Sequence, residues 1–221
     1  AERFPGRVIP TPIAEQGFLG LAGGVASEGS YRPVVELMYA DFALVAADQA
    51  FNQIAKARHM FGGDAPMPLV LRSKCAIGTG YGSQHSMDPA GLYAMWPGWR
   101  IVAPSTPFDY VGLMNSALRC EDPVLVIEHV ALYNTTGPGP LEDLDYCIPL
   151  GRAKVVRPGS AFTLLTYLAL TPLAVQAADA MGLDVEVMSR FDYFAGSVSA
   201  DTRRVAHGLG AHTIVMRGTK A

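Results

Sequence analysis

Short apolar runs alternating with helical stretches constrain the fold of this chain more than any other feature. The runs are VVELMY (34–39), PLVLRS (68–73), RIVAPS (100–105) and VLVIEH (124–129). Strands this apolar are typical of a parallel sheet that is covered by helices on both faces, because neither face then meets water. The intervening patterns predict helices at about 42–59, 89–95 and 107–119. We therefore expect an α/β domain with a parallel sheet.

A second, smaller unit is expected after a stretch rich in Gly, Pro and acidic residues. Residues 136–150, TGPGPLEDLDYCIPL, have the composition of a linker between domains. The pattern after it predicts strands at 162–167, 184–190 and 212–217, and helices at 172–181 and 200–207. The expected organisation is a first domain over 1–135, a linker over 136–150 and a βαβ-type unit over 151–221, which is short for an independent open sheet.

Composition excludes several classes of partner. Only 17% of the residues are charged and the net charge is −3, so a nucleic-acid partner is not expected, since phosphate binding needs a basic face. The low charge favours an extensive protein interface. Cys75, Cys120 and Cys147 lack CxxC spacing and are expected to be free thiols in the cytoplasm. No signal peptide is expected at the start of the sequence.

An uncharged stretch from Ser160 to Ala178 nearly reaches the length of a membrane span. However, the hydropathy pattern of this stretch indicates two elements, a strand followed by a helix. FTLLTY reads as a buried strand, and Thr171-Pro172 reads as the N-cap and first residue of a helix. A membrane partner is therefore not expected.

Glu15, in TPIAEQGF, is the first candidate functional residue. Thr11 is expected to cap a helix that starts at Pro12, which places Glu15 in the first turn. A carboxylate in that position offsets the helix dipole. Alternatively, it is held against a nitrogen heterocycle in a dry pocket. The residues alone leave both interpretations open.

Phe42 is expected at the start of the next helix, with Asp41 as its N-cap. The core stripe of that helix is expected to consist of Leu44, Ala47, Phe51 and Ile54. At 100° per residue Phe42 lies away from this stripe. It either stacks on a ligand or partner, or makes an ordinary packing contact.

His85 follows the glycine-rich loop GTGYGS (78–83) and is the histidine best suited to chemistry. The loop comes after an apolar strand, where doubly wound sheets bind ligands, and imidazole titrates near neutrality. The loop is not a dinucleotide fingerprint, because Ser83 stands where a glycine is needed. His85 is either a general acid–base or a bystander, His129 is a weaker candidate, and His207 and His212 are expected to be structural or merely exposed.

Taken in order, these segments resemble the β subunit of the 2-oxo acid dehydrogenase E1 component, the family of the pyruvate, branched-chain and acetoin enzymes. The resemblance is strongest between Arg7 and Tyr133. It is carried by RVIPTPIAEQGFLGLAGG, RPVVELMYADF, ADQAFNQIAK, MFGG, PLVLRS, QHS and RIVAPSTPFDYVGLMNSALRCEDPVLVIEH. It implies an α/β fold with a parallel-sheet thiamine-diphosphate pyrimidine-binding domain, its N-terminal edge missing, followed by a partial transketolase C-terminal-type α/β domain.

The resemblance also implies roles for the three candidate residues. Glu15 matches the glutamate that hydrogen-bonds N1′ of the aminopyrimidine of thiamine diphosphate and favours its imino tautomer. Phe42 matches the aromatic residue that packs on the aminopyrimidine, and His85 matches the histidine credited with proton transfer around the lipoyl step. The cofactor itself carries the decarboxylation of the 2-oxo acid.

The same resemblance implies partners. The diphosphate and its Mg²⁺ need a GDG motif with a downstream Asn, which this chain lacks and the family's α subunit carries. We expect an α2β2-like assembly with an E1 α subunit, and acyl transfer to the lipoyl domain of the acyltransferase E2. Some relatives hold a structural potassium ion at positions matching Leu69, Ala117, Cys120 and Asp122. Because Cys120 replaces an expected acid, no metal is assigned to this chain.

Two other functions remain open from the sequence. One is a split transketolase-like carboligase subunit, which uses Glu15 in the same way but passes the acyl unit to an aldehyde. The other is a non-catalytic paralogue that keeps the fold, against which the intact Glu15, Phe42 and His85 argue.

Overall fold

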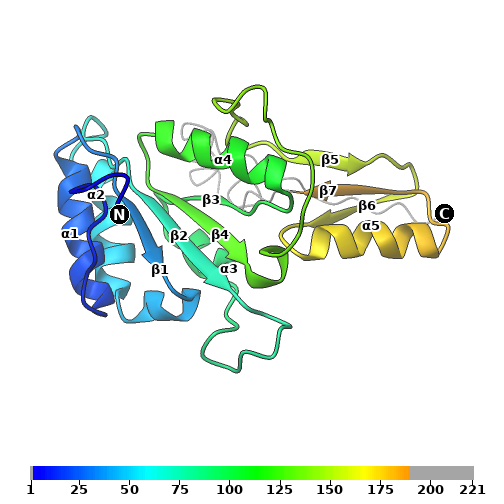
Figure 1. The fold of residues 1–221 in the computed structure, drawn as a ribbon, viewed down its shortest axis with the longest axis horizontal. Helices are drawn as coiled ribbons and strands as arrows, with labels where there is room; N and C mark the ends of the chain where they lie inside the picture. The colour runs from blue at the N-terminus through cyan, green and yellow to red at the C-terminus, as the bar shows by residue number, and fades with distance from the viewer. Residues whose placement is uncertain (1, 190–221) are drawn as a thin grey trace.

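The computed structural model describes residues 2–189, which carry two β-sheets (Figure 1). The first sheet is parallel throughout, with strand order β1-β2-β4-β3. Its strands are β1 (Val34–Leu37), β2 (Val70–Cys75), β3 (Arg100–Val102) and β4 (Val124–His129). This sheet confirms the predicted α/β class and all four strand positions within a few residues.

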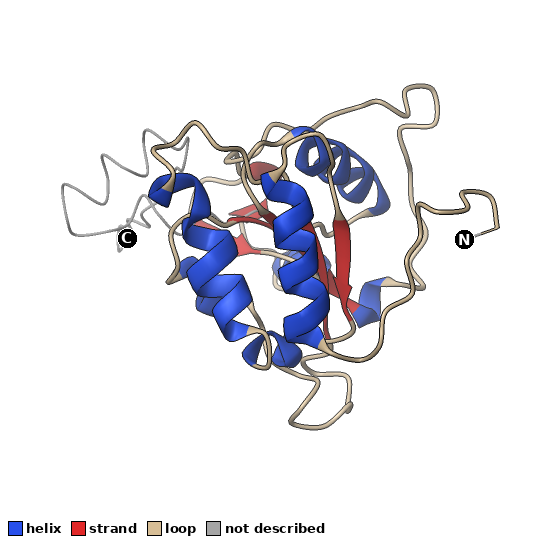
Figure 2. Cartoon of the chain, turned by 90° about the vertical axis from the view of Figure 1, so that its left-hand side faces the viewer, coloured by secondary structure: helices blue, strands red, loops and turns tan. Residues whose placement is uncertain are grey.

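Side chains of the first sheet alternate between two separate cores. Leu71 and Cys75 of β2 face one core, and Val70 faces the other. Helix α1 (Glu15–Ser27) and the helical segment 40–60 cover the first core, and Figure 2 looks onto this helical layer. Helix α4 (Pro107–Arg119) covers the second. All six residues of β4 are buried, which explains why this strand is apolar without alternation.

Helix α4 matches the predicted range 107–119 because its start is strongly specified. The Thr106 side chain caps it by accepting a hydrogen bond from Asp109 N at 3.1 Å, and Pro107 occupies the first turn, where a missing N–H costs nothing. The short α3 (Ala90–Ala94) is also confirmed.

The segment 40–60 is helical as predicted, but it is not one regular α-helix. It consists of a 3₁₀ turn η1 (Ala40–Leu44), a π-helix η2 (Asp48–Ile54) and α2 (Ala55–Met60). These changes of winding rotate the buried face, so Leu44 is 60% exposed and does not belong to the core. The core residues of this segment are Ala43, Ala46, Ala50, Phe51, Ile54, Ala55 and Ala57, and Ala47 is partly buried against them. Asp41 lies inside η1 and is not its N-cap.

The Gly- and Pro-rich segment after β4 lies along α4. Asn115 Nδ2 donates to the carbonyl oxygens of Leu144 and Tyr146 at 2.8 and 2.9 Å. Ile148 N donates to Gly112 O at 3.0 Å, and a Cβ at Gly112 would lie 2.6 Å from an Ile148 side-chain atom. The segment is thus held against the helix by specific contacts. It begins with the 3₁₀ turn η3 (Val130–Leu132).

The second sheet has the order β5-β7-β6, with β5 (Lys154–Arg157), β6 (Phe162–Thr166) and β7 (Val185–Ser189). Strands β6 and β7 are parallel and joined by α5 (Leu170–Ala180), which confirms the predicted βαβ unit. Strand β5 is antiparallel and was not expected. The helix predicted at 200–207 and the strand at 212–217 lie outside the described residues.

The predicted cap at Thr171-Pro172 is wrong. Helix α5 already begins at Leu170, and its N-cap residue is Ala169. The Thr171 hydroxyl is instead buried where the two sheets meet, 2.9 Å from the Ser105 hydroxyl and 3.3 Å from that of Ser189. No helix within residues 2–189 is long and apolar enough to cross a membrane.

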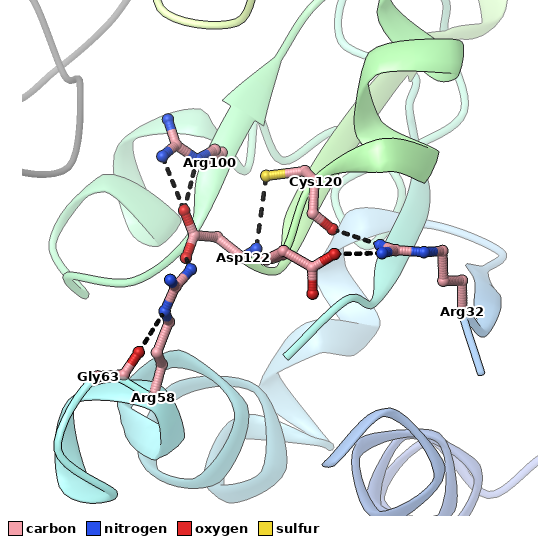
Figure 3. A network of polar contacts seen from close by, with 7 residues as sticks. Arg32, Arg58, Gly63, Arg100, Cys120 and Asp122 are labelled. Atoms are coloured by element: carbon pink, nitrogen blue, oxygen red, sulfur yellow. Dashed lines mark hydrogen bonds and ion pairs between the residues drawn. The ribbon is translucent and has the colours of Figure 1, made fainter. Parts of the chain in front are cut away.

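A charged network fixes the turn between α4 and β4 (Figure 3). The buried Asp122 carboxylate pairs with Arg58 of α2 and, at 2.7 Å, with Arg100 of β3. Arg32 donates to the Cys120 carbonyl oxygen at 2.8 Å and pairs with the carboxylate of Glu121. The turn therefore connects α2, β3 and the segment before β1.

Candidate functional site

Three segments lie at the carboxyl end of the first sheet. Strand β1 leads directly into η1, and β2 leads into a long loop, 76–89, which we call the His85 loop. Helix α1 connects to the start of β1 and runs antiparallel to it, so the beginning of α1 lies at the same end (Figure 1). In open parallel sheets this end is where ligands bind.

Glu15 is the first residue of α1, so its predicted place in the first turn is confirmed. The predicted cap at Thr11 is wrong, because the helix begins three residues later than expected and its N-cap, Ala14, offers no side-chain hydrogen bond. The Glu15 side chain is half-buried and forms no hydrogen bond or ion pair with any other residue in 2–189. Its carboxylate oxygens are free to accept hydrogen bonds from a ligand.

Phe42 and His85 lie against each other. Their ring centroids are 5.7 Å apart and the planes are nearly perpendicular. Two further rings join them: Tyr39 lies 4.3 Å from the imidazole and Tyr81 lies 6.4 Å from it. We call Tyr39, Phe42, Tyr81 and His85 the aromatic cluster. The structure thus brings two of the three predicted residues into contact, and it places Glu15 at the same end of the sheet without a hydrogen bond to either.

Backbone contacts close the His85 loop and attach it to η1. Ala76 N donates to His85 O at 3.1 Å, joining the two ends of the loop. Met87 N donates to the Asp41 carboxylate at 3.2 Å. Asp41, expected as a helix cap, therefore holds the loop across a sequence separation of 46 residues.

His129, the last residue of β4, also holds the loop. Its Nδ1 accepts a hydrogen bond from Ala131 N at 3.2 Å, so Nδ1 is unprotonated. The proton of the neutral ring is then on Nε2, which donates to Ile77 O at 3.1 Å. Both ring nitrogens are occupied, which makes His129 a structural residue.

Asp88 links the loop to the second sheet. One carboxylate oxygen accepts from Ala90 N at 2.9 Å at the start of α3, and the other accepts the hydroxyl of Tyr167, which follows β6. The next residue, Leu168, is buried in the core of the first sheet and adopts a φ of +52°, which is unfavourable for a side chain of this size. The second unit therefore inserts into the first directly beside the loop.

Two further titratable groups near this end are not suited to chemistry. Burial raises the pKa of the Cys75 thiol, which keeps it protonated and unreactive. Burial would also raise the pKa of Glu128, but hydrogen bonds from Arg72, Tyr110 and Tyr133 outweigh it and hold that pKa below its ordinary value. Glu128 is thus an ionised member of a structural network, in which burial and the carboxylate raise the pKa of Tyr110 to about 12.

Comparison with known families identifies this arrangement. The family described as "Transketolase, pyrimidine binding domain" matches residues 1–136, which include the whole first sheet and all three candidate residues. The chain belongs to this family.

Similar members of the transketolase pyrimidine-binding family include β subunits of oxidoreductases. The β subunit of acetoin:2,6-dichlorophenolindophenol oxidoreductase from Cupriavidus necator is 40% identical over 185 residues, covering 82% of this chain and 54% of that protein. The mitochondrial pyruvate dehydrogenase E1 component subunit beta-2 from Oryza sativa is 38% identical over 190 residues, covering 84% and 50%. The 2-oxoisovalerate dehydrogenase subunit beta from Pseudomonas aeruginosa is 36% identical over 197 residues, covering 82% and 56%.

A solved structure supports the fold over both sheets. A split-gene transketolase, described as an inactive beta4 tetramer, matches with a TM-score of 0.66 and 22% identity, covering 86% of this chain and 58% of that one. The chain spans about half the length of the relatives that it matches.

Sequence reasoning missed Tyr39, Tyr81 and Asp88, which shape the site of this family member. Asp41 was expected only as a helix cap and His129 only as a weaker catalytic candidate, whereas both hold the His85 loop. Tyr39 follows a strand at its carboxyl end, and that position could have indicated a place in the site. The partners of Asp41 and Asp88 lie 46 and 79 residues away, so no local pattern reveals them.

Proposed function

We propose that this chain is the β-type subunit of a thiamine-diphosphate enzyme that decarboxylates a 2-oxo acid, or cleaves acetoin, and transfers the acyl unit to a lipoyl group. The observation that carries the proposal is that η1 and the His85 loop are in contact through Phe42 and His85 at the carboxyl end of the sheet, the end at which α1 begins with Glu15. The names of the similar β subunits support the reaction class.

The residues at this end fit the aminopyrimidine of the cofactor. When bound, thiamine diphosphate supplies the nucleophilic carbon and the electron sink for decarboxylation. Glu15 would accept a hydrogen bond from a ring nitrogen, and a carboxylate without another partner is suited to that task. Phe42 would offer an aromatic surface for the ring. His85 would carry a proton to or from the lipoyl sulfur.

The remainder of the active site is proposed to belong to an α-type partner, which would hold the diphosphate and Mg²⁺. The sequence carries no GDG motif for these groups. Large apolar side chains on or next to the segments at this end are exposed and would be covered by the partner: Ile13, Met38, Leu44, Val45, Ile77 and Tyr81. A lipoyl domain of an acyltransferase is the proposed acceptor, and the cytoplasm is the proposed compartment.

The test combines the chain with its α-type partner, thiamine diphosphate, Mg²⁺ and either a 2-oxo acid or acetoin, and follows dye reduction. Glu15→Gln should lower kcat about 10- to 150-fold, since a hydrogen bond to a charged group is worth about 1.5–3 kcal/mol. Glu28→Gln, at the exposed far end of the same helix, is the matched control and should leave kcat unchanged.

Full activity of Glu15→Gln at saturating cofactor would refute the assignment of Glu15. A ketol product formed from an added aldehyde, with no need for a lipoyl acceptor, would replace the proposal with a carboligase. A stable complex that shows no thermal shift with cofactor would indicate a non-catalytic subunit.

A further inference from the structure

The imidazole of His85 is oriented by ring contacts. No hydrogen bond from residues 2–189 reaches its ring nitrogens, although its backbone N and O are both bonded. The loop before it contains Gly78, Gly80 and Gly82, all with positive φ, which provide no side chains to support the ring. The backbone of His85 is therefore fixed by the loop, while the direction of its imidazole depends on its neighbours in the aromatic cluster.

Tyr39 is the nearest of these neighbours. Its ring centroid lies 4.3 Å from that of His85, at an interplanar angle of 73°. The corresponding distances are 5.7 Å for Phe42 and 6.4 Å for Tyr81. At 4.3 Å the two rings are in van der Waals contact, which blocks rotation of the imidazole past the phenol.

Tyr39 is itself held by the sheet. Its carbonyl oxygen accepts the first hydrogen bond of η1, from Phe42 N at 3.1 Å. The Lys74 ammonium group lies over its ring, 5.7 Å from the centroid, and is kept there by Glu36 at 3.3 Å. Tyr81, in contrast, is mostly exposed and belongs to the same loop as His85, so it moves with the histidine. The Tyr39 hydroxyl also interacts with Tyr81 on the loop, but the Tyr39 ring is held from outside the loop, by η1 and by Lys74.

We propose that Tyr39 is a positioning residue for His85, which holds the imidazole in the orientation needed for proton transfer; this rests on the proposed function. The ring supplies the constraint, and the hydroxyl is not required for it. Loss of the ring lets the imidazole sample other orientations, and misplacement of a catalytic group lowers the rate of the step that it serves.

Two assays on the complete enzyme separate this role from general structural support. Dye reduction takes electrons without a lipoyl group, whereas acylation of a lipoyl domain uses the His85 proton. Tyr39→Leu should lower the lipoyl-dependent rate about 3- to 30-fold more than the dye-linked rate. Tyr39→Phe, which keeps the ring, should retain both rates within about twofold. Tyr31→Leu, at an exposed tyrosine before β1, is the control and should change neither. Equal loss of both rates in Tyr39→Leu would overturn the inference, as would similar loss in Tyr39→Phe.

A readout that does not need activity uses the chain alone. With histidine labelled at Cε1, the His85 resonance is identified by its absence in His85→Gln. Tyr39→Leu should move that resonance towards its position in an unstructured peptide, and Tyr39→Phe should leave it in place. An unchanged resonance in Tyr39→Leu would overturn the inference even if the enzyme is active. A wild-type complex without lipoyl acylation would refute the proposed function, while the resonance would still report whether Tyr39 orients His85.

Discussion

Replacing Glu128 with glutamine removes one negative charge from the first sheet and leaves the side-chain volume almost unchanged. The carboxylate accepts two hydrogen bonds from Arg72, at 2.6 and 3.0 Å, and one each from the hydroxyls of Tyr110 and Tyr133, both at 2.7 Å. An amide offers one oxygen in place of two. Its NH₂ group must then face an N–H of Arg72, which cannot accept, and one tyrosine must turn its hydroxyl around.

The expected loss of stability follows from this geometry. Breaking a buried ion pair costs about 3–5 kcal/mol, and Glu128 is only 5% exposed. Arg72 is 32% exposed, so water recovers part of the loss on that side. We therefore expect Glu128→Gln to lower the free energy of unfolding by about 2–4 kcal/mol at pH 7.

Glu36→Gln is the matched control. Glu36 contacts the same Arg72, at 3.5 Å, but it is 45% exposed, and surface pairs contribute about 0–1 kcal/mol. Urea unfolding followed by tryptophan fluorescence measures both variants, because Trp99 is buried in the core of the first sheet. A Glu128→Gln variant no less stable than Glu36→Gln would refute the reasoning.

The pH dependence provides a second check on Glu128. Because the folded protein lowers the pKa of this carboxyl, its contribution is fully present above the unfolded pKa of about 4.3 and is lost as the pH falls through the lower folded value. The stability difference between wild type and Glu128→Gln should therefore shrink below about pH 4. A difference that stays constant from neutral pH into this range would contradict the assignment of an ionised, stabilised Glu128.

Two further predictions concern the packing of the first unit and the His85 loop. Gly98→Ala should destabilise the protein by more than about 4 kcal/mol, because a Cβ at this φ of +118° would lie 1.8 Å from the carbonyl oxygen of Ala55. Gly91→Ala is the control, because a Cβ at Gly91 in α3 would meet no atom within 4 Å, and it should be neutral or slightly stabilising. Thermal unfolding measures both variants, and equal melting temperatures would contradict the packing argument. Asp41→Ala should accelerate amide exchange across residues 77–88, because Met87 N loses its acceptor. The free energy of local opening of the loop should fall by about 1.5–3 kcal/mol. Exchange identical to wild type in that segment would show that other contacts fix the loop.

The parts of the fold that the sequence predicts are specified either by burial of both faces of a strand or by capping residues close in the sequence. Strand β4 is apolar because both of its faces are covered, and α4 carries its own cap in Thr106 and Pro107. The 3₁₀ and π windings of 40–54 were not predictable, because a single helical period was assumed and the sequence contains no Gly or Pro in that range to mark the change. Strand β5 is short and largely exposed, so its hydropathy pattern is weak.

The candidate site likewise contains residues that the sequence predicts and residues that it does not. Glu15, Phe42 and His85 were found because they occur in recognisable segments in a fixed order. The first-turn position of Glu15 is confirmed, the contact between Phe42 and His85 was not predicted, and the chemical roles of all three residues stay predictions. The parts that Tyr39, Asp41 and His129 play in holding His85 and its loop were not predicted, because each acts through a contact between distant segments. Tyr39 and Tyr81 are 42 positions apart (81 minus 39), and only the folded chain brings their rings within 5.7 Å.

The contact between Asp88 and Tyr167 has a consequence for how such chains can recombine. A crossover between two related genes near residues 136–150 would leave both sheets intact, yet residues 88 and 167, which are in contact here, would then come from different parents. Leu168 would likewise enter the core of a foreign first sheet. Chimeras joined there should work best when positions 88, 167 and 168 come from the same parent, even though these positions lie on opposite sides of the junction.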